Sequence, residues 1–518
     1  MNKLWKIVLV SFSCIFIYWL SPPTQVTAAT NNKVLLVYDS QNTVRNSTKN
    51  IDALQRSLTS MHLRVKTIEQ SDYHSGDLNQ SYAGVITMVN WREVGLINQK
   101  FVNDRNKFDG IKLHIGPDPD ATEIKELGSQ ANKLYRQQFI LKNNQNEQLL
   151  PFSNTITVFN DLPKGAQQIG TLATQQADQK NYPFGVINGK YGYLPIFRPS
   201  GLALMMEIQL IGKLFSQAGS YRPLLTFTNI TPYSNLETID ELSLYCYKNE
   251  IPFAISTTSV SRNTDLKAFS RFTTTLRNVE DRGGLVFLNA PEVSNADNSG
   301  TTLDQMFSTY IVTLSQHQVF PVGVSSPGYW NQDQTLRTNF LGYADHWLML
   351  PNPVEPTYVD QDNQAQVAKV SWYAMPMSSL KEITHNSSMR FAIPTALTIP
   401  LPSTEKRTGM VKREINRLQM DWYDPVDDNM TTKIETPSTL LQYKHGDYYA
   451  NGKYEEVQIS NSSLNKQFND GKPKAALKGY FKIQGHIFMA FFVVVTIILA
   501  IFIYLGQKVY WNRMRRKK

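Results

Sequence analysis

The sequence predicts a mixed α/β protein in which two regions of parallel sheet lie between an apolar segment at each end of the chain. Continuous apolar runs such as 34–38 and 224–227 are typical of parallel strands buried on both faces. Between these runs, apolar residues recur at helical spacing, for example in 50–61. Strands that alternate with helices predict parallel sheets covered by helices. A length of 518 residues favours two or three folded units.

The first folded unit is expected at 31–135. Asp39, Ser40, Asn90 and Trp91 are expected at the carboxyl ends of its strands, but no GxGxxG or phosphate-binding loop accompanies them. The strand and helix order resembles that of flavodoxin- or amidotransferase-like domains, and the segment is interpreted as a scaffold or docking domain. Strands are expected at 32–40, 63–70, 82–90 and 110–115, and helices at 50–61 and 92–104.

A β-rich connecting region is expected at 136–221. Asn188-Gly189 between two apolar runs predicts a hairpin turn, and a helix at 201–215 leads to the next unit. From 222 to 405, strands and helices alternate again, which predicts a complete or truncated (β/α) barrel. The polar segment 406–485 is expected to form a membrane-proximal cap or stalk.

Three segments of the predicted barrel carry a family likeness. They are "LTFTNITP" (225–232), "IPFAIS" (251–256) and "GGLVFLNAPEV" (283–293). In this order and spacing they resemble the polysaccharide deacetylase-like families. The nearest likeness is to bacterial envelope proteins that carry a DUF2334-type domain in a distorted (β/α) barrel. The likeness spans about a third of the chain.

The resemblance also implies a chemistry that this sequence departs from. In the family, one aspartate is the general base, and a second aspartate and two histidines hold a divalent metal that activates water. The corresponding positions here are Thr228, Asn229, Asn289 and Val293, none of which can ionise near neutral pH. Because a hydrolytic metal needs about three protein ligands, we expect a non-catalytic domain with no metal or other cofactor.

Amides, hydroxyls and aromatic rings near the predicted strand ends suggest glycan binding instead. Sugar sites place aromatic faces against the rings and polar side chains against the hydroxyls. The alternative is that the aromatic residues only fill the barrel core, and that His346 and His385 have ordinary packing or surface roles. No HExxH or GxSxG motif occurs. The candidates are Thr228, Asn229, Tyr233, Asn289, Glu292, Trp330, His346 and Trp347.

The segment "DWYDPVDD" (421–428) concentrates four acids around two aromatic residues. Such a cluster is compatible with a Ca²⁺ site, but it lacks the glycine and terminal glutamate of an EF-hand loop. A solvated acidic loop is the alternative.

The two ends of the chain predict its location. Residues 1–29 have the basic start, apolar core and small residues of a signal peptide cleaved after Ala28 or Ala29, and an uncleaved anchor is the alternative. Residues 486–506 are long and apolar enough to span a bilayer, and the basic tail 507–518 is expected in the cytoplasm. The bulk of the chain would then be extracellular.

Charge and cysteine content agree with this topology. The net charge is +9, but six positive charges lie in the tail and two near the start, so the rest is close to neutral and predicts no nucleic-acid binding. After removal of the signal peptide only Cys246 remains, and an exported chain without disulfides favours a bacterial surface.

Together these features predict a membrane-anchored accessory protein of exopolysaccharide or cell-envelope glycan synthesis, as in biofilms. It would bind polysaccharide or dock a membrane glycosyltransferase or another envelope protein. Two alternatives remain open: an active glycan deacetylase or hydrolase with a non-standard site, and a purely structural assembly partner.

Overall fold

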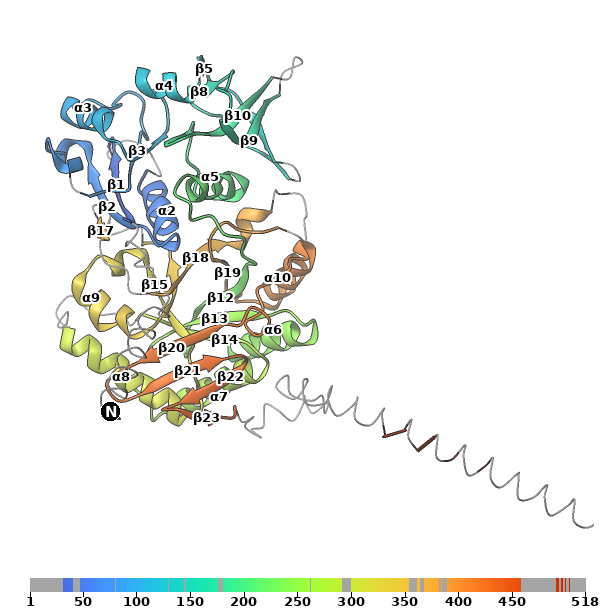
Figure 1. The fold of residues 1–518 in the computed structure, drawn as a ribbon. Helices are drawn as coiled ribbons and strands as arrows, with labels where there is room; N and C mark the ends of the chain where they lie inside the picture. The colour runs from blue at the N-terminus through green and yellow to red at the C-terminus, as the bar shows by residue number, and fades with distance from the viewer. Residues whose placement is uncertain are drawn as a thin grey trace, which may run out of the picture.

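The computed structural model describes most of the chain between 31 and 457 and a few positions between 491 and 503 (Figure 1). The gaps in the first range are 41–46, 80, 129, 144–145, 176–179, 261, 291–299, 354–360, 364–367, 382 and 384–388. The described part is a mixed α/β structure with a parallel barrel and a large sheet, as the sequence predicts.

The N-terminal half forms nine strands of a ten-stranded sheet of order β17-β2-β1-β3-β4-β11-β10-β9-β6-β7, and the C-terminal half adds the edge strand β17, antiparallel to β2. Strands β1 to β4 are parallel, β11 joins β4 in parallel, and the strands beyond β11 are antiparallel. The sheet therefore continues across the boundary predicted at residue 135. Its strands are β1 (Lys33–Tyr38), β2 (Arg64–Glu69), β3 (Gly84–Met88), β4 (Ile111–Ile115), β6 (Phe139–Lys142), β7 (Glu147–Leu149), β9 (Gln167–Thr174), β10 (Asn181–Asn188), β11 (Tyr191–Leu194) and β17 (Gln361–Asn363).

Two elements of this half bear directly on the predictions. The hairpin expected at Asn188-Gly189 is present, because Asn188 pairs with Tyr191 and Gly189 has a φ of 56°. A helix is expected at 92–104, and its predicted start is wrong. Helix α3 (Gln99–Lys107) begins only after Asn98, whose side chain accepts hydrogen bonds from the first turn.

A separate two-stranded sheet joins β5 (Ala131–Leu134) to β8 (Ile156–Phe159).

Helices cover both faces of the ten-stranded sheet. The side chains of Leu35 and Val37 pack with Phe101 of α3 on one face, whereas Leu36 belongs to the core on the other face. Helices α2 (Ser47–Ser60) and α5 (Gly201–Leu214) lie on that second face, between the sheet and the barrel (Figure 1). The short helix α4 (Ala121–Leu127) packs against β10 and β11.

The C-terminal half contains a closed barrel of seven parallel strands, which confirms the predicted barrel. Each strand carries a nearly continuous apolar or small-residue run, so both faces are buried. The strands are β12 (Leu224–Ile230), β13 (Phe253–Thr258), β14 (Leu285–Asn289), β15 (Gly323–Pro327), β16 (His346–Leu350), β18 (Val370–Pro376) and β19 (Thr395–Pro400). The helices are α6 (Leu236–Lys248), α7 (Lys267–Asp281), α8 (Gly300–Gln316), α9 (Gln334–Asn339) and α10 (Glu405–Leu418).

Helices of the N-terminal half complete the outer wall of this barrel. In the described part of the chain, no α-helix connects β16 to β18 or β18 to β19; the 3₁₀ turn η5 (Met377–Leu380) follows β18. Helix α2 packs against β18 and against the 3₁₀ turn η3 (Gly328–Asn331), and α5 packs against η5. The two halves therefore share one hydrophobic core that runs from the sheet into the barrel.

Glu207 of α5 is a fully buried acid in this shared core. One carboxyl oxygen accepts a hydrogen bond from the Arg198 backbone N–H at 2.9 Å, and the other has no partner among the described residues. Burial raises the pKa of Glu207 well above its ordinary value, and the hydrogen bond from Arg198 opposes this only in part. Burial therefore favours the protonated, neutral form of Glu207 in the folded protein.

The Glu207→Gln variant is expected to be more stable than the wild type above about pH 4.3, the ordinary glutamate pKa. Its advantage in the free energy of unfolding should grow as the pH rises. Above that pH, the unfolded chain loses the Glu207 proton while the folded protein keeps it. The wild type thus loses up to about 1.4 kcal/mol of stability per pH unit at this group until the raised folded pKa is reached. Urea unfolding at several pH values measures the difference. Equal pH slopes for wild type and variant would contradict it, and Glu147→Gln on the surface serves as the control.

A four-stranded antiparallel sheet packs near the amino ends of β15 and β16. The Asp345 N–H donates to the carbonyl of Lys433 at 3.0 Å, and the Lys433 N–H returns a bond of 2.8 Å to the Asp345 carboxylate. The rings of Phe320 and Tyr448 pack beside them, 5.8 Å between centroids. Much of the segment 406–485 is therefore folded onto the barrel. Its strands are β20 (Thr431–Glu435), β21 (Leu440–Lys444), β22 (Asp447–Ala450) and β23 (Lys453–Glu455).

Among the described residues, no helix is long and apolar enough to cross a membrane. The predicted signal peptide and almost all of the span predicted at 486–506 lie outside these residues. Both stay predictions.

Candidate functional site at the barrel mouth

The inward face of the barrel can be assigned from one hydrogen bond. The hydroxyls of Ser256 on β13 and Ser325 on β15 lie 2.7 Å apart, although β14 separates their strands. Such a contact across a strand is possible only inside the barrel. Because side chains alternate along a strand and parallel partners share a face, Thr226, Thr258 and Asn289 also point inward.

The carboxyl end of the barrel is lined by neutral polar groups on three neighbouring strands. On the inward face, Thr258 and Asn289 end β13 and β14, and Thr228 lies two residues before the end of β12. Thr226 and Ser256 precede two of them by two residues on the same strands, and Ser325 of β15 is the register partner of Asn289; all three are buried. In barrels of this type, the carboxyl end is where catalytic side chains are placed. On their inward faces, the described ends of these three strands supply hydroxyls and one amide but no carboxylate or imidazole.

Asn289 has an unsatisfied hydrogen-bonding atom. Its backbone carbonyl accepts from the N–H and the hydroxyl of Ser259, at 3.2 and 2.7 Å. Its side-chain oxygen Oδ1 is buried and has no partner among the described residues. A buried acceptor without a donor costs about 1–3 kcal/mol. This position therefore favours an additional donor, such as a ligand hydroxyl.

The polar segment "TNITPYSN" (228–235) covers the irregular end of β12 and the turn that leads to α6. The parallel register shifts between Phe227 and Ile230, and Asn229 there has a φ of 60°, a conformation that asparagine tolerates better than most residues. Asn235 then caps α6 by accepting from two backbone N–H groups of the first turn. Asn229 and Tyr233 are exposed, with 91% of Tyr233 accessible, so both are free to meet a large ligand beside the mouth.

Three other predicted site residues lie elsewhere. Trp347 is buried and points out of the barrel, where its Nε1–H donates to the Ser326 hydroxyl at 2.8 Å. Trp330 is buried in η3 against Phe340, with ring centroids 5.1 Å apart. Their faces are covered by protein, which favours the alternative that these rings fill the core. His346 begins β16 at the amino end of the barrel, opposite the mouth, and its Nδ1 lies 2.8 Å from Asp345.

The structure thus brings Thr228 and Asn289 together and adds Thr258, Ser256 and Ser325, which sequence reasoning missed. The strand "FAISTT" (253–258) carries a partial signal for two of them, because the large apolar residues Phe253 and Ile255 alternate with small ones, which places Ser256 and Thr258 on the opposite face. Glu292 and His385 lie outside the described residues. Within the described ranges, no group of three or more His, Cys, Asp or Glu side chains is arranged to hold a metal ion.

The carboxyl end of the N-terminal sheet is occupied by its own backbone. The Asp39 carboxylate accepts hydrogen bonds from the N–H groups of Asn90 and Trp91, at 2.9 and 2.7 Å. Burial raises the pKa of Asp39, while these bonds oppose the shift. Asp39 therefore joins the ends of β1 and β3, which agrees with a scaffold role.

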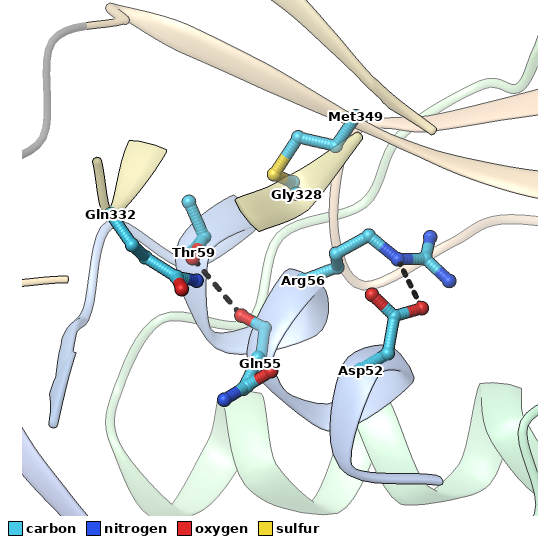
Figure 2. A pocket seen from close by; sticks show the side chains of 7 residues that line it. All are labelled: Asp52, Gln55, Arg56, Thr59, Gly328, Gln332 and Met349. Carbon is cyan, nitrogen blue, oxygen red and sulfur yellow. Dashed lines mark hydrogen bonds and ion pairs between the residues drawn. The ribbon is translucent and has the colours of Figure 1, made fainter. Parts of the chain in front are cut away.

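Arg56, which forms a buried ion pair with Asp52 of the same helix, joins α2 to the barrel (Figure 2). The Arg56 Nε donates to Asp52 at 3.0 Å, and Nη1 donates to the Ala374 carbonyl of β18 at 3.1 Å. The guanidinium carbon lies 4.4 Å from the centroid of the Tyr373 ring. The space around these groups does not admit a water molecule, so this contact is a packed interface and not a binding site.

A comparison of the sequence with protein-family models finds no match, and a comparison with curated proteins finds none either.

Proposed function

We propose that the chain is a membrane-anchored extracellular accessory protein of exopolysaccharide or cell-envelope glycan synthesis. Its barrel would be a non-catalytic relative of the polysaccharide deacetylase domains. The observation that carries this proposal is the set of inward-facing residues at the carboxyl ends of β12, β13 and β14, which are Thr228, Thr258 and Asn289.

These side chains suit binding better than hydrolysis. Hydroxyls and an amide can donate to and accept from sugar hydroxyls without any change in protonation. None of them can take a proton from water near pH 7, and none is a strong ligand for a hydrolytic metal. The unpaired Oδ1 of Asn289 and the exposed ring of Tyr233 provide an acceptor and an apolar surface at the same end of the barrel. The mouth would hold a glycan segment or present it to a membrane glycosyltransferase.

The first test is a deacetylation assay with the full chain purified in detergent. Incubation with fully acetylated chitooligosaccharides and Zn²⁺, Co²⁺ or Mn²⁺ is expected to release no acetate above the rate without protein. A polysaccharide deacetylase serves as the positive control. Acetate release that disappears in Glu292→Gln would overturn the proposal and favour the active enzyme.

The second test measures binding at the mouth. The same oligosaccharides are expected to bind the wild type, and Asn289→Ala should weaken binding at least tenfold because it removes the amide that faces inward at the mouth. Thr313→Ala, at a partly exposed position of α8 away from the mouth, serves as the control. Absence of binding to any neutral, cationic or anionic glycan would favour the purely structural assembly partner.

A further inference from the structure

A cleft lies at the opposite end of the barrel from the mouth. It has a volume of about 330 Å³, which is in the lower part of the range for small-molecule sites. Three separate segments form it: the turn before β12, the turn before β19 and the loop after α10. Its lining residues are Ser220, Tyr221, Arg222, Arg390, Asp421, Tyr423 and Asp428.

The charged groups of this cleft form one connected network. Arg222 contacts Asp421 at 3.3 Å and Asp428 at 2.7 Å, and Arg390 contacts Asp421 from the other side. The hydrogen bond to Asp428 is the main cause of a raised pKa at Arg222, so its positive charge is secure. The network joins two arginines to two carboxylates, and the cleft is therefore close to neutral.

This network also decides between the two interpretations of 421–428. Asp421 and Asp428 bind arginines, and the Asp424 carboxylate accepts from the N–H groups of Val426 and Asp427 at 2.8 and 3.2 Å. Three of the four acids thus have protein partners. Asp421, Asp427 and Asp428 are exposed, which agrees with a solvated acidic loop. The contacts with protein groups leave too few free carboxylates to surround Ca²⁺, which needs six to eight oxygen ligands.

Aromatic rings complete the walls. Tyr221 is 39% exposed, and its backbone pairs with Phe391 through two hydrogen bonds of 2.8 and 3.0 Å. Its ring lies over Gly219, where a Cβ atom would come within 2.2 Å of it, so the glycine permits this ring position. Tyr423 packs edge-on against Trp372 with centroids 4.9 Å apart. Both rings are therefore held in place before any ligand arrives.

We propose that this cleft is a second binding site, and that its ligand is a short segment of neutral glycan. Sugar hydroxyls can accept from the remaining guanidinium N–H groups and donate to the carboxylate lone pairs without breaking the ion pairs. A charged ligand would have to displace one of the ion-pair partners, which has a cost. Tyr221 offers an exposed ring face to a pyranose. This site rests on the proposed glycan function and would give the protein two contacts along one polymer.

The experiment uses hydrogen–deuterium exchange of the full chain in detergent, with and without an N-acetylglucosamine tetramer. The tetramer is expected to slow exchange of backbone amides in 219–223, 389–392 and 421–428. Tyr221→Ala should remove this protection and leave the protection near Asn289 intact. Tyr221→Phe keeps the ring and should retain the protection. The glucosamine tetramer, which is cationic, and a galacturonate tetramer, which is anionic, serve as charged probes.

Each of the other outcomes contradicts one part of the proposal or of the proposed function. Protection near Asn289 without protection at the cleft would overturn the second site and leave the proposed function standing. Protection at the cleft together with metal-dependent acetate release would support the site and overturn the non-catalytic function. Protection at the cleft only by a charged tetramer would overturn the neutral ligand class, and no protection by any tetramer would overturn the site. Unchanged unfolding of Tyr221→Ala in urea excludes a folding defect.

Discussion

Replacing Arg56 with alanine is expected to lower the free energy of unfolding by about 3–5 kcal/mol. The guanidinium is buried between α2 and β18 and is the partner of Asp52, which is itself 9% exposed. Without Arg56, the Asp52 charge is left buried with no cation beside it, and the Ala374 carbonyl loses its donor. Urea unfolding of the full chain, followed by tryptophan fluorescence, measures the change.

The matched control is Arg92→Ala. Arg92 makes an ion pair of the same length, 3.0 Å to Asp118, but its side chain is 40% exposed. Because water screens exposed pairs, the loss should stay below about 1 kcal/mol. Equal losses for the two variants would contradict a structural role of Arg56 between the halves. Hydrogen exchange adds a local readout, since Arg56→Ala should expose the amides of α2 and β18 before those of α3.

The second large effect is expected at Glu123, the centre of a buried charged cluster in the N-terminal half. Its carboxylate pairs with the Arg105 guanidinium and lies 3.0 Å from the Nδ1 of His114, and all three side chains are nearly inaccessible. It also accepts from the Asp120 N–H at 2.9 Å, which completes a capping box at the start of α4. Glu123→Ala is therefore expected to cost about 3–5 kcal/mol, because it leaves a buried arginine without this partner.

The same cluster predicts an acid-sensitive stability. Burial alone would raise the pKa of Glu123, but Arg105 and His114 outweigh it and hold the pKa well below its usual range. A lowered folded pKa means that the unfolded chain takes up the proton first as pH falls. The stabilisation is thus complete above the ordinary glutamate pKa of about 4.3 and is lost below it. Urea unfolding between pH 6 and pH 3 should show a steeper decline in wild type than in Glu123→Ala.

Two outcomes would contradict this account. A loss in Glu123→Ala no larger than that of Glu126→Ala would show that the buried cluster contributes no more than a partly exposed acid of the same helix. Parallel pH profiles of wild type and Glu123→Ala between pH 6 and pH 3 would show that the acid sensitivity comes from other carboxylates.

Local patterns in the sequence identified most of the secondary structure of the two parallel regions. Apolar runs such as 34–38 and 224–227 predict buried strands because both of their faces are covered, whatever covers them. The same patterns predicted the barrel, since repeated strand-helix units with short connections allow few other arrangements. The absence of ionisable residues in 224–232 was likewise visible in the sequence and excluded a base on that strand.

The partners of each element were decided only by the tertiary structure. Periodicity shows that α2 and α5 have apolar faces, but it cannot show that those faces cover β18 and η5 of a distant segment. An aromatic residue near a strand end can fill the core or line a site, and the direction of its side chain depends on strand register. Strand register turns the Trp347 side chain out of the barrel, where it is buried. It turns the Thr258 side chain inward at the mouth. Hydrophobic pattern is a property of neighbouring residues, whereas a binding surface is made by residues far apart in the chain.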